Sequence, residues 1–253
     1  MEKNDFKVAK EASRANVQTV RASEPTAVPT RTPVKAVIFD MDGVLLDTES
    51  ICFICWERAA RELGIDGISC VYKKCVGTNV SDTLQILKNA YGSDFNAEKF
   101  YARTSELFHV VEAEKGIEKM PYAAECLQSL KRAGYRLALA SSTREVTVRR
   151  QLKEAGLLDF FETVTCGDSV KHSKPEPDIY IKACQSLNLL PEDCVAVEDS
   201  FNGVRSAVRA GMKCVMIPDQ LEPTEEIKKL ASTVLHDLSE LVSWLAQVGY
   251  HTS

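Results

Sequence analysis

VKAVIFDMDG, residues 34–43, is a run of apolar and β-branched residues that ends in a pair of acids. Its apolar part predicts a strand buried inside a sheet. Further runs of this kind predict strands at 135–142, 161–166, 194–199, 213–218 and 232–236. Helical patterns lie between them at 122–133, 145–155, 178–187, 201–210 and 237–247. Strands that alternate with helices predict parallel βαβ units, and hence an α/β fold with a doubly wound, Rossmann-like parallel sheet.

One interval, 48–119, breaks this alternation because it contains no convincing strand pattern. Its helical patterns lie at 48–63, 81–91 and 96–118. We therefore expect a helical cap over 48–119, inserted into a Rossmann-like catalytic core that is formed by 34–47 and 120–253. Residues 1–33 are polar and of mixed charge, with prolines near their end, which predicts a disordered or weakly structured extension.

Composition and charge narrow the classes of function. The 253 residues are 45% apolar, which allows a large core and a smaller module. A formal net charge of -5 favours neither nucleic acid nor an anionic membrane as a partner. No apolar run approaches the ~18 residues of a membrane span. The size fits a monomer.

Nine cysteines without a secretory signal predict free thiols in a reducing compartment, so we expect a cytoplasmic protein. Acids among the first 24 residues argue against a targeting peptide, because transit peptides are poor in acids. Cys52 and Cys55 form a C-x-x-C pair, but they lie in a helical pattern with no second pair. A packing role is therefore favoured over a zinc or redox site.

Asp40 and Asp42 follow the first predicted strand and point to the same side of an extended segment. Open α/β sheets bind their ligands beyond the carboxyl ends of the strands. Two carboxylates this close repel each other, so they need a shared proton or a cation, and Mg²⁺ would leave room for a phosphate. Alternatively, an Asp caps the next helix after a turn at Gly43. The D-x-D-G pattern alone leaves both interpretations open.

Three other strand ends carry residues that suit a phosphate. One predicted strand ends in Ser141 and Ser142, where hydroxyls and free backbone N–H groups can hold an anion or cap a helix. Lys174 stands in the sequence SKPEPD, whose prolines fix the backbone and aim the ammonium. The strand at 194–199 ends in Glu198 and Asp199, which are costly to bury without a cation. Metal ligation explains these two acids better than helix capping.

Taken in order, these motifs resemble those of the haloacid dehalogenase-like hydrolase superfamily. They are DMDGVLLDTE from residue 40, a hydroxyl after LALA, KPEPD from residue 174 and VEDSFNG from residue 197. The helical insertion after the first motif resembles the subgroup that contains β-phosphoglucomutase and small sugar-phosphate phosphatases. The likeness extends from residue 34 to about residue 220. The family's dehalogenases usually lack the second acid of the first motif, so Asp42 favours phosphate chemistry.

The resemblance implies a Mg²⁺-dependent phosphatase that hydrolyses a small phosphorylated metabolite, a sugar or polyol phosphate, through an aspartyl-phosphate intermediate. It implies that Asp40 is the nucleophile and Asp42 the general acid–base. It also implies that Ser141 and Lys174 bind the phosphoryl oxygens. The implied Mg²⁺ ligands are Asp40, Asp42 through its backbone carbonyl, Glu198 and Asp199.

The resemblance also places a substrate-contacting loop of the cap at Gly77, Thr78 and Asn79, although an ordinary helix–helix loop fits the same residues. A phosphosugar mutase is the first alternative function. In the mutase of the subgroup, a histidine follows the first motif and an arginine lies in the cap loop; Cys52 and Val80 stand at these positions here. A non-catalytic binding protein is the second alternative, and the intact motifs argue against it.

Overall fold

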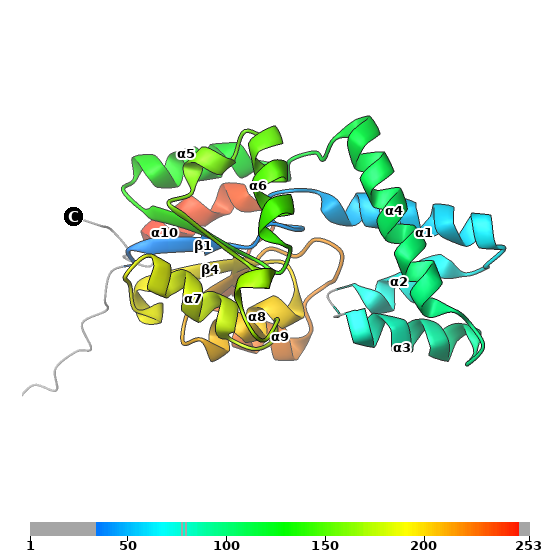
Figure 1. Ribbon diagram of the computed structural model, residues 1–253. Helices are drawn as coiled ribbons and strands as arrows, with labels where there is room; N and C mark the ends of the chain where they lie inside the picture. Colours follow the sequence, from blue (N-terminus) through cyan, green and yellow to red (C-terminus); the bar gives the residue numbers. More distant parts are fainter. Residues whose placement is uncertain (1–33, 77, 79, 248–253) are drawn as a thin grey trace, which may run out of the picture. The chain divides into compact units, whose positions relative to one another are not determined.

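Six parallel strands form one sheet in the order β3-β2-β1-β4-β5-β6 (Figure 1). They are β1 (Ala36–Phe39), β2 (Arg136–Ser141), β3 (Thr163–Cys166), β4 (Cys194–Glu198), β5 (Lys213–Met216) and β6 (Thr233–Val234). This computed structural model describes residues 34–76, 78 and 80–247, so the extension expected at 1–33 lies outside the described residues. The order of the strands reverses at β1, and the predicted doubly wound sheet is confirmed.

Side chains of the central strand alternate between two apolar layers, one on each face of the sheet. Val37 and Phe39 belong to the first layer, and Ala36 and Ile38 to the second. The first layer is covered by α5 (Ala123–Arg132), α6 (Glu145–Glu154) and α10 (Leu241–Gln247). The second is covered by α7 (Asp178–Ser186), α8 (Phe201–Arg209) and α9 (Glu225–Leu230). A strand that is buried on both faces explains why VKAVIF contains no polar alternation after Lys35.

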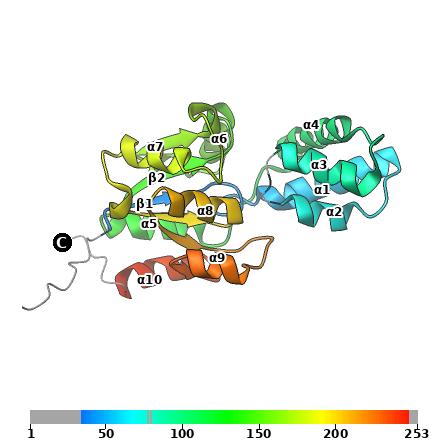
Figure 2. The same ribbon diagram turned by 90° about the horizontal axis from the view of Figure 1, so that it is seen from below.

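Four helices between β1 and α5 enclose an apolar core of their own, and Figure 2 shows them as one group. They are α1 (Thr48–Leu63), α2 (Ile68–Cys75), α3 (Val80–Tyr91) and α4 (Ala97–Lys115). The rings of Trp56 and Phe100 meet edge to face in this core, with 5.3 Å between their centroids. The helical cap is therefore confirmed, and its helices lie within the predicted interval 48–119.

Some elements were not predicted because they are too short to show a period. They are the helices α2 and α9 and three 3₁₀ turns, η1 (Leu158–Phe160), η2 (Gly167–Ser169) and η3 (Pro191–Asp193). The helix predicted at 237–247 begins with a further 3₁₀ turn, η4 (Leu238–Glu240), before α10. Eight residues of α2 complete only about two helical turns, which is less than a periodicity argument needs. Predicted helix and strand ends otherwise differ from the observed ones by a few residues.

Two segments connect the cap to the core side by side. Leu46 forms an antiparallel bridge with Lys119, and the backbone N–H of Asp47 donates to the carbonyl of Glu118 at 2.9 Å. These short backbone contacts bring the entrance and the exit of the insertion together. They place the first turn of α1 immediately after the acids that follow β1.

All nine cysteines lie in the described residues as free thiols, as expected. Cys55 is buried in the core of the cap, which agrees with the packing role. Among the described residues, helices long and apolar enough to span a bilayer are absent.

Candidate active site

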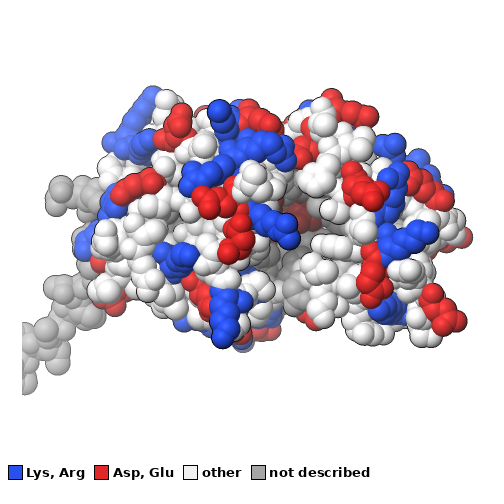
Figure 3. Space-filling model, in the orientation of Figure 1, with Lys and Arg blue, Asp and Glu red and all other residues white. Residues whose placement is uncertain are grey.

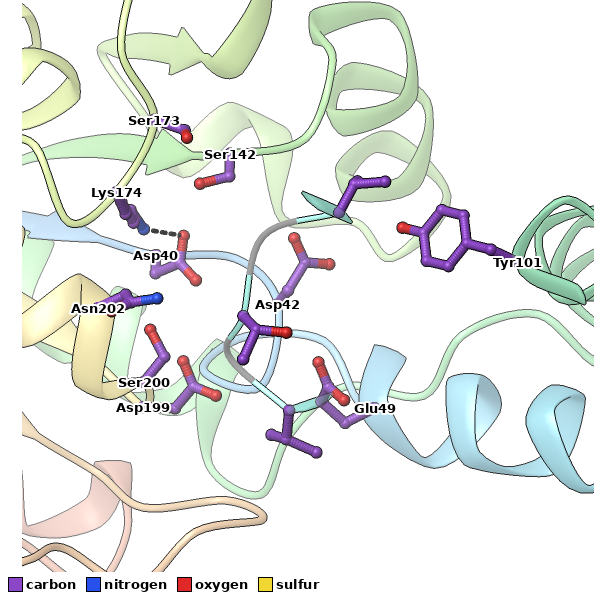
Figure 4. Close-up of a pocket in the computed structure, with 13 residues that line it drawn as sticks. Asp40, Asp42, Glu49, Tyr101, Ser142, Ser173, Lys174, Asp199, Ser200 and Asn202 are labelled. Atoms are coloured by element: carbon purple, nitrogen blue, oxygen red, sulfur yellow. Dashed lines mark hydrogen bonds and ion pairs between the residues drawn. The ribbon is translucent and has the colours of Figure 1, made fainter. Parts of the chain in front are cut away.

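The carboxyl ends of β1 and β4 bring oppositely charged side chains together in the interior. The Lys174 ammonium donates to Asp40 Oδ1 at 2.8 Å (Figure 4). It also donates to Glu198 Oε1 at 2.6 Å. A third hydrogen bond, of 3.2 Å, reaches the backbone carbonyl of Ala140 at the end of β2. The exposed fractions are only 9% for Lys174 and 7% for Asp40. Three residues predicted at separate strand ends therefore form one buried ionic network.

Glu198 is fully buried, and both of its carboxylate oxygens accept hydrogen bonds. Besides Lys174, the Tyr180 hydroxyl donates to Oε1 at 2.8 Å. Oε2 accepts from the backbone N–H groups of Asp199 and Ser200, at 3.2 and 3.3 Å, and from the Ser200 hydroxyl at 3.1 Å. These donors compensate a charge that would otherwise be expensive to bury. Sequence reasoning missed Tyr180, since an aromatic residue in a helical pattern suggests only core packing.

Gly203, in the first turn of α8, makes room for this carboxylate. A Cβ atom there would lie 1.8 Å from the carboxyl carbon of Glu198 and within 2.0 Å of both oxygens. The glycine is part of the VEDSFNG motif, and its role is steric rather than conformational. It lets a fully buried acid lie directly against the start of the helix.

We expect Gly203→Ala to lower the free energy of unfolding by about 1–3 kcal/mol, the usual effect of overpacking, because Glu198 has to move. The same movement should disturb Lys174 and reduce the phosphatase activity that the resemblance implies. Gly211→Ala is the control: its Cβ would meet only Pro191, at 3.8 Å, and the substitution strains a backbone with φ of +87°. Denaturant unfolding and phosphate release measure the two effects. Loss of stability with activity retained in Gly203→Ala would contradict the proposed link to Glu198.

Asp40, Glu198 and Asp199 each present a carboxylate oxygen, and these oxygens lie within 4.8 Å of one another. Burial, reinforced by the two neighbouring acids, raises the pKa of Asp199 well above its ordinary value. Burial also raises the pKa of Asp40 to about 7, although Lys174 opposes this shift. These carboxylates are hard oxygen donors, and their mutual repulsion favours an added positive charge. The cluster therefore fits a divalent cation such as Mg²⁺.

Lys174 remains the positive member of the cluster. Burial works to lower the pKa of its ammonium, but the carboxylates of Asp40 and Glu198 outweigh burial and raise it. The lysine is therefore held charged between the two carboxylates.

Asp42 has a different set of partners from Asp40. Its Oδ2 accepts from the Thr143 hydroxyl at 3.0 Å and from the Ser141 hydroxyl at 3.4 Å. Burial raises the pKa of the Asp42 carboxyl above its ordinary value. Hydrogen bonds, including the one from Thr143, oppose this rise. A raised pKa suits an acid that has to carry a proton to a leaving group near neutral pH.

A cavity of about 370 Å³ opens beside these residues (Figure 4). Its charged lining residues are Asp40, Asp42, Glu49, Lys174 and Asp199. Helices and loops of the cap contribute Val76, Thr78, Val80 and Tyr101. Among the predicted cap residues, Thr78 lines the cavity, and Gly77 and Asn79 lie outside the described residues. Sequence reasoning assigned no role to Glu49, although this residue ends the DMDGVLLDTE motif, and it missed Tyr101, which fits an ordinary helical pattern.

The two serines after β2 differ in their access to this cavity. Ser142 is exposed and lines it, whereas Ser141 is fully buried. The Ser141 hydroxyl already accepts from the backbone N–H of Thr143 at 3.1 Å and contacts Asp42. A phosphate contact by Ser141 stays a prediction, and the accessible hydroxyl belongs to Ser142.

The acidic character of the site is a local feature. On the face shown in Figure 3, cationic and anionic side chains are interspersed over the surface. The carboxylates at the ends of β1 and β4 are therefore a buried cluster, and the face shown in Figure 3 does not extend them into an acidic surface patch.

Comparisons with known proteins agree with this geometry. The family model described as haloacid dehalogenase-like hydrolase matches residues 37–217, which include the whole ionic cluster. A phosphorylated carbohydrates phosphatase from Thermotoga maritima is 32% identical, over 85% of this chain and 100% of the relative. A β-phosphoglucomutase from Bacillus subtilis is 28% identical, over 72% of this chain and 82% of the relative. A mutant form of CbbY from Rhodobacter sphaeroides, whose crystal structure is a complex with xylulose-(1,5)bisphosphate, is 27% identical in sequence. Its structure matches this one with a TM-score of 0.64, over 82% of this chain and 96% of that chain.

Proposed function

The chain belongs to the haloacid dehalogenase-like hydrolases and is a phosphoric monoester hydrolase, and from that premise we propose that it hydrolyses a sugar or polyol phosphate with Mg²⁺ bound, through an aspartyl-phosphate on Asp40. One observation carries the proposal: Asp40, paired with Lys174, lines the same cavity as Asp42. A nucleophile, a fixed cation and a separate acid are the parts that phosphoryl transfer requires.

In the first half-reaction a carboxylate oxygen of Asp40 attacks phosphorus while the bond to the ester oxygen breaks. Lys174 and the Ser142 hydroxyl bind the phosphoryl oxygens, and Lys174 also balances the charge of the nucleophile. Asp42 donates its proton to the departing oxygen, so the alcohol leaves as a neutral molecule. The phosphoryl group remains on Asp40.

In the second half-reaction Asp42, now ionised, accepts a proton from a water molecule. The water oxygen attacks phosphorus, the bond to Asp40 breaks and inorganic phosphate leaves. Asp42 is protonated again and Asp40 is again a carboxylate. The hydrogen bond from Thr143 holds Asp42 in place through both steps.

Asp40, Asp199 and the backbone carbonyl of Asp42 would hold Mg²⁺, which supplies positive charge against the phosphoryl oxygens when bound. Glu198 lies within the same group of acids. Its five hydrogen bonds already orient it, so its main task is to position Lys174. Direct ligation of the ion by Glu198 stays a prediction.

A phosphosugar mutase is the second candidate, and the similarity to a β-phosphoglucomutase favours it. Two side chains argue for hydrolysis. Where the mutase pattern has an arginine, Val80 lines the cavity that Asp40 also lines. Where it has a histidine, Cys52 lines an adjoining cavity. Glucose 1-phosphate supplied with a bisphosphate activator distinguishes the two activities, because a mutase yields an isomer and a phosphatase yields free phosphate.

Removal of the metal ion tests the proposal directly. Chelation should lower phosphate release from p-nitrophenyl phosphate by at least ~100-fold, since a bound metal contributes several kcal/mol to such reactions. Added Mg²⁺ should restore the rate, and a panel of sugar and polyol phosphates should be hydrolysed under the same conditions. Turnover that is insensitive to chelator would exclude the proposed mechanism.

A further inference from the structure

Tyr180 of α7 brings a hydroxyl group into an apolar layer. Its side chain is fully buried, and it is the largest such side chain among the described residues. It belongs to the second apolar layer of the sheet, whose other buried members are aliphatic or carry sulfur. A phenylalanine ring would fill the same space, so packing explains the ring of Tyr180 but not its hydroxyl. A buried tyrosine hydroxyl normally requires a hydrogen-bond partner.

That partner belongs to the ionic cluster. The Tyr180 hydroxyl donates at 2.8 Å to Glu198 Oε1, the same oxygen that accepts from Lys174 at 2.6 Å. The Lys174 nitrogen also lies 5.2 Å from the centroid of the Tyr180 ring. This distance is within the range of a cation–π contact. One side chain therefore contacts both members of the Lys174–Glu198 ion pair.

The Lys174 ammonium has an acceptor for each of its three protons. Asp40 Oδ1, Glu198 Oε1 and the backbone carbonyl of Ala140 accept them, at 2.8, 2.6 and 3.2 Å. An ammonium has no further donor, so it binds a phosphoryl oxygen when one of these acceptors releases it. In the proposed function Asp40 is that acceptor, because its carboxylate loses its negative charge when it becomes an acyl phosphate. Glu198 and Ala140 then hold the ammonium.

Glu198 can hold the ammonium in place while its own Oε1 is fixed. Donors from Asp199 and Ser200 fix the other oxygen, Oε2. Oε1 accepts from Lys174 and from Tyr180. Without the tyrosine hydroxyl, the donor left on Oε1 is the ammonium itself. The two members of the ion pair would then shift together as Asp40 is phosphorylated.

Tyr180 does not reach the substrate itself. Lys174 lines the cavity beside Asp40, whereas Tyr180 has no exposed surface and does not line it. Any effect of its hydroxyl on the reaction must therefore pass through Glu198 and Lys174.

We infer that Tyr180 is a positioning residue for phosphoryl transfer: its hydroxyl fixes Glu198, and Glu198 holds the Lys174 ammonium in place while Asp40 becomes phosphorylated. This inference rests on the proposed function, because only there does Lys174 bind the phosphoryl oxygens. The contribution of the hydroxyl is made in the transition state and not in the binding of substrate.

Tyr180→Phe removes the hydroxyl and keeps the ring. With p-nitrophenyl phosphate, we expect kcat to fall about tenfold and KM to change by less than about twofold, because a small displacement of the ammonium weakens mainly the transition state. The Mg²⁺ concentration for half-maximal activity should also change by less than about twofold, since Lys174 is not a metal ligand. Tyr91→Phe is the matched control. It removes a hydroxyl that donates to the carbonyl of Asp66 within the cap at 3.1 Å, and it should leave all three constants unchanged.

Inhibition by two anions separates positioning from a general loss of structure. Orthovanadate adopts the five-coordinate geometry of phosphorus in the transition state, whereas inorganic phosphate is the product. In Tyr180→Phe the inhibition constant of orthovanadate should rise about tenfold, in parallel with the loss of kcat, and that of phosphate should change by less than about twofold.

A double-mutant cycle tests whether the hydroxyl acts through the ammonium. Lys174→Met keeps most of the length of the side chain and removes its charge. In that background Tyr180→Phe should change the residual kcat by less than about twofold, because the group that the hydroxyl positions is gone. A further loss of about tenfold would overturn the inference. If Lys174→Met does not fold, the comparison of orthovanadate with phosphate decides alone.

Other results distinguish this inference from the proposed function. An unchanged kcat in Tyr180→Phe, or equal weakening of orthovanadate and phosphate, would reduce Tyr180 to a packing residue and overturn the inference. A parallel rise in the Mg²⁺ requirement would overturn it too, since the hydroxyl would then act through the metal ligands. Absence of Mg²⁺-dependent hydrolysis of p-nitrophenyl phosphate by the unmodified chain would instead remove the proposed function.

Discussion

Asp40→Asn should abolish phosphate release, with a fall in kcat of at least ~10⁴-fold, because a neutral amide cannot form the acyl phosphate. The fold should survive. An amide oxygen can still accept from Lys174, whose second ion pair with Glu198 remains. Removing one of three neighbouring acids also relieves their mutual repulsion, so the stability of the metal-free chain should not decrease. Steady-state phosphate release and thermal unfolding measure the two quantities.

Detection of the intermediate makes this test specific. Acid-quenched reactions of the unmodified chain should contain protein whose mass is increased by one phosphoryl group, and those of Asp40→Asn should contain none. Asp159→Asn, an exposed position in η1, is the control for loss of one negative charge and should behave like the unmodified chain. Robust turnover by the Asp40→Asn protein would rule out the covalent route.

Asp42→Asn should lower kcat by about 10²–10⁴-fold for an alkyl phosphate, the usual contribution of a positioned acid or base, with a much smaller change in substrate binding. A nitrophenolate leaving group needs little help from an acid, so phosphorylation of Asp40 by p-nitrophenyl phosphate should persist. The second half-reaction still lacks its base. The variant should therefore release one burst of nitrophenolate and accumulate the aspartyl-phosphate.

Asp47→Asn is the matched control for this experiment. Asp47 caps α1 by accepting from the backbone N–H of Ser50 at 3.1 Å, and asparagine caps helices about as well as aspartate. This variant should retain the kcat of the unmodified chain. An unchanged kcat in Asp42→Asn, or no burst and no trapped phosphoprotein, would contradict the acid–base role of Asp42.

Local patterns in the sequence predicted most of the fold. The apolar run before Asp40 and the alternation of strands with helices were enough to predict the parallel sheet, because burial on both faces leaves a recognisable composition. The same local rules placed the chemically active residues at strand ends, where the parallel arrangement collects them. Short elements such as α2 escaped prediction, since about two turns of helix give too few residues for a period.

Tertiary structure alone decided which groups touch. The hydrogen bonds from Lys174 to Asp40 and Glu198 join residues that are 134 and 24 positions apart. The Tyr180 hydroxyl, which also donates to Glu198, comes from a position two residues after the KPEPD motif. Gln151 is a similar case, because only the approach of Glu112 from the cap gives its amide nitrogen an acceptor. A sequence records the preference of each segment for helix or strand. Long-range contacts depend on how the packed layers and the cap bring those segments together, and these contacts form the ionic cluster.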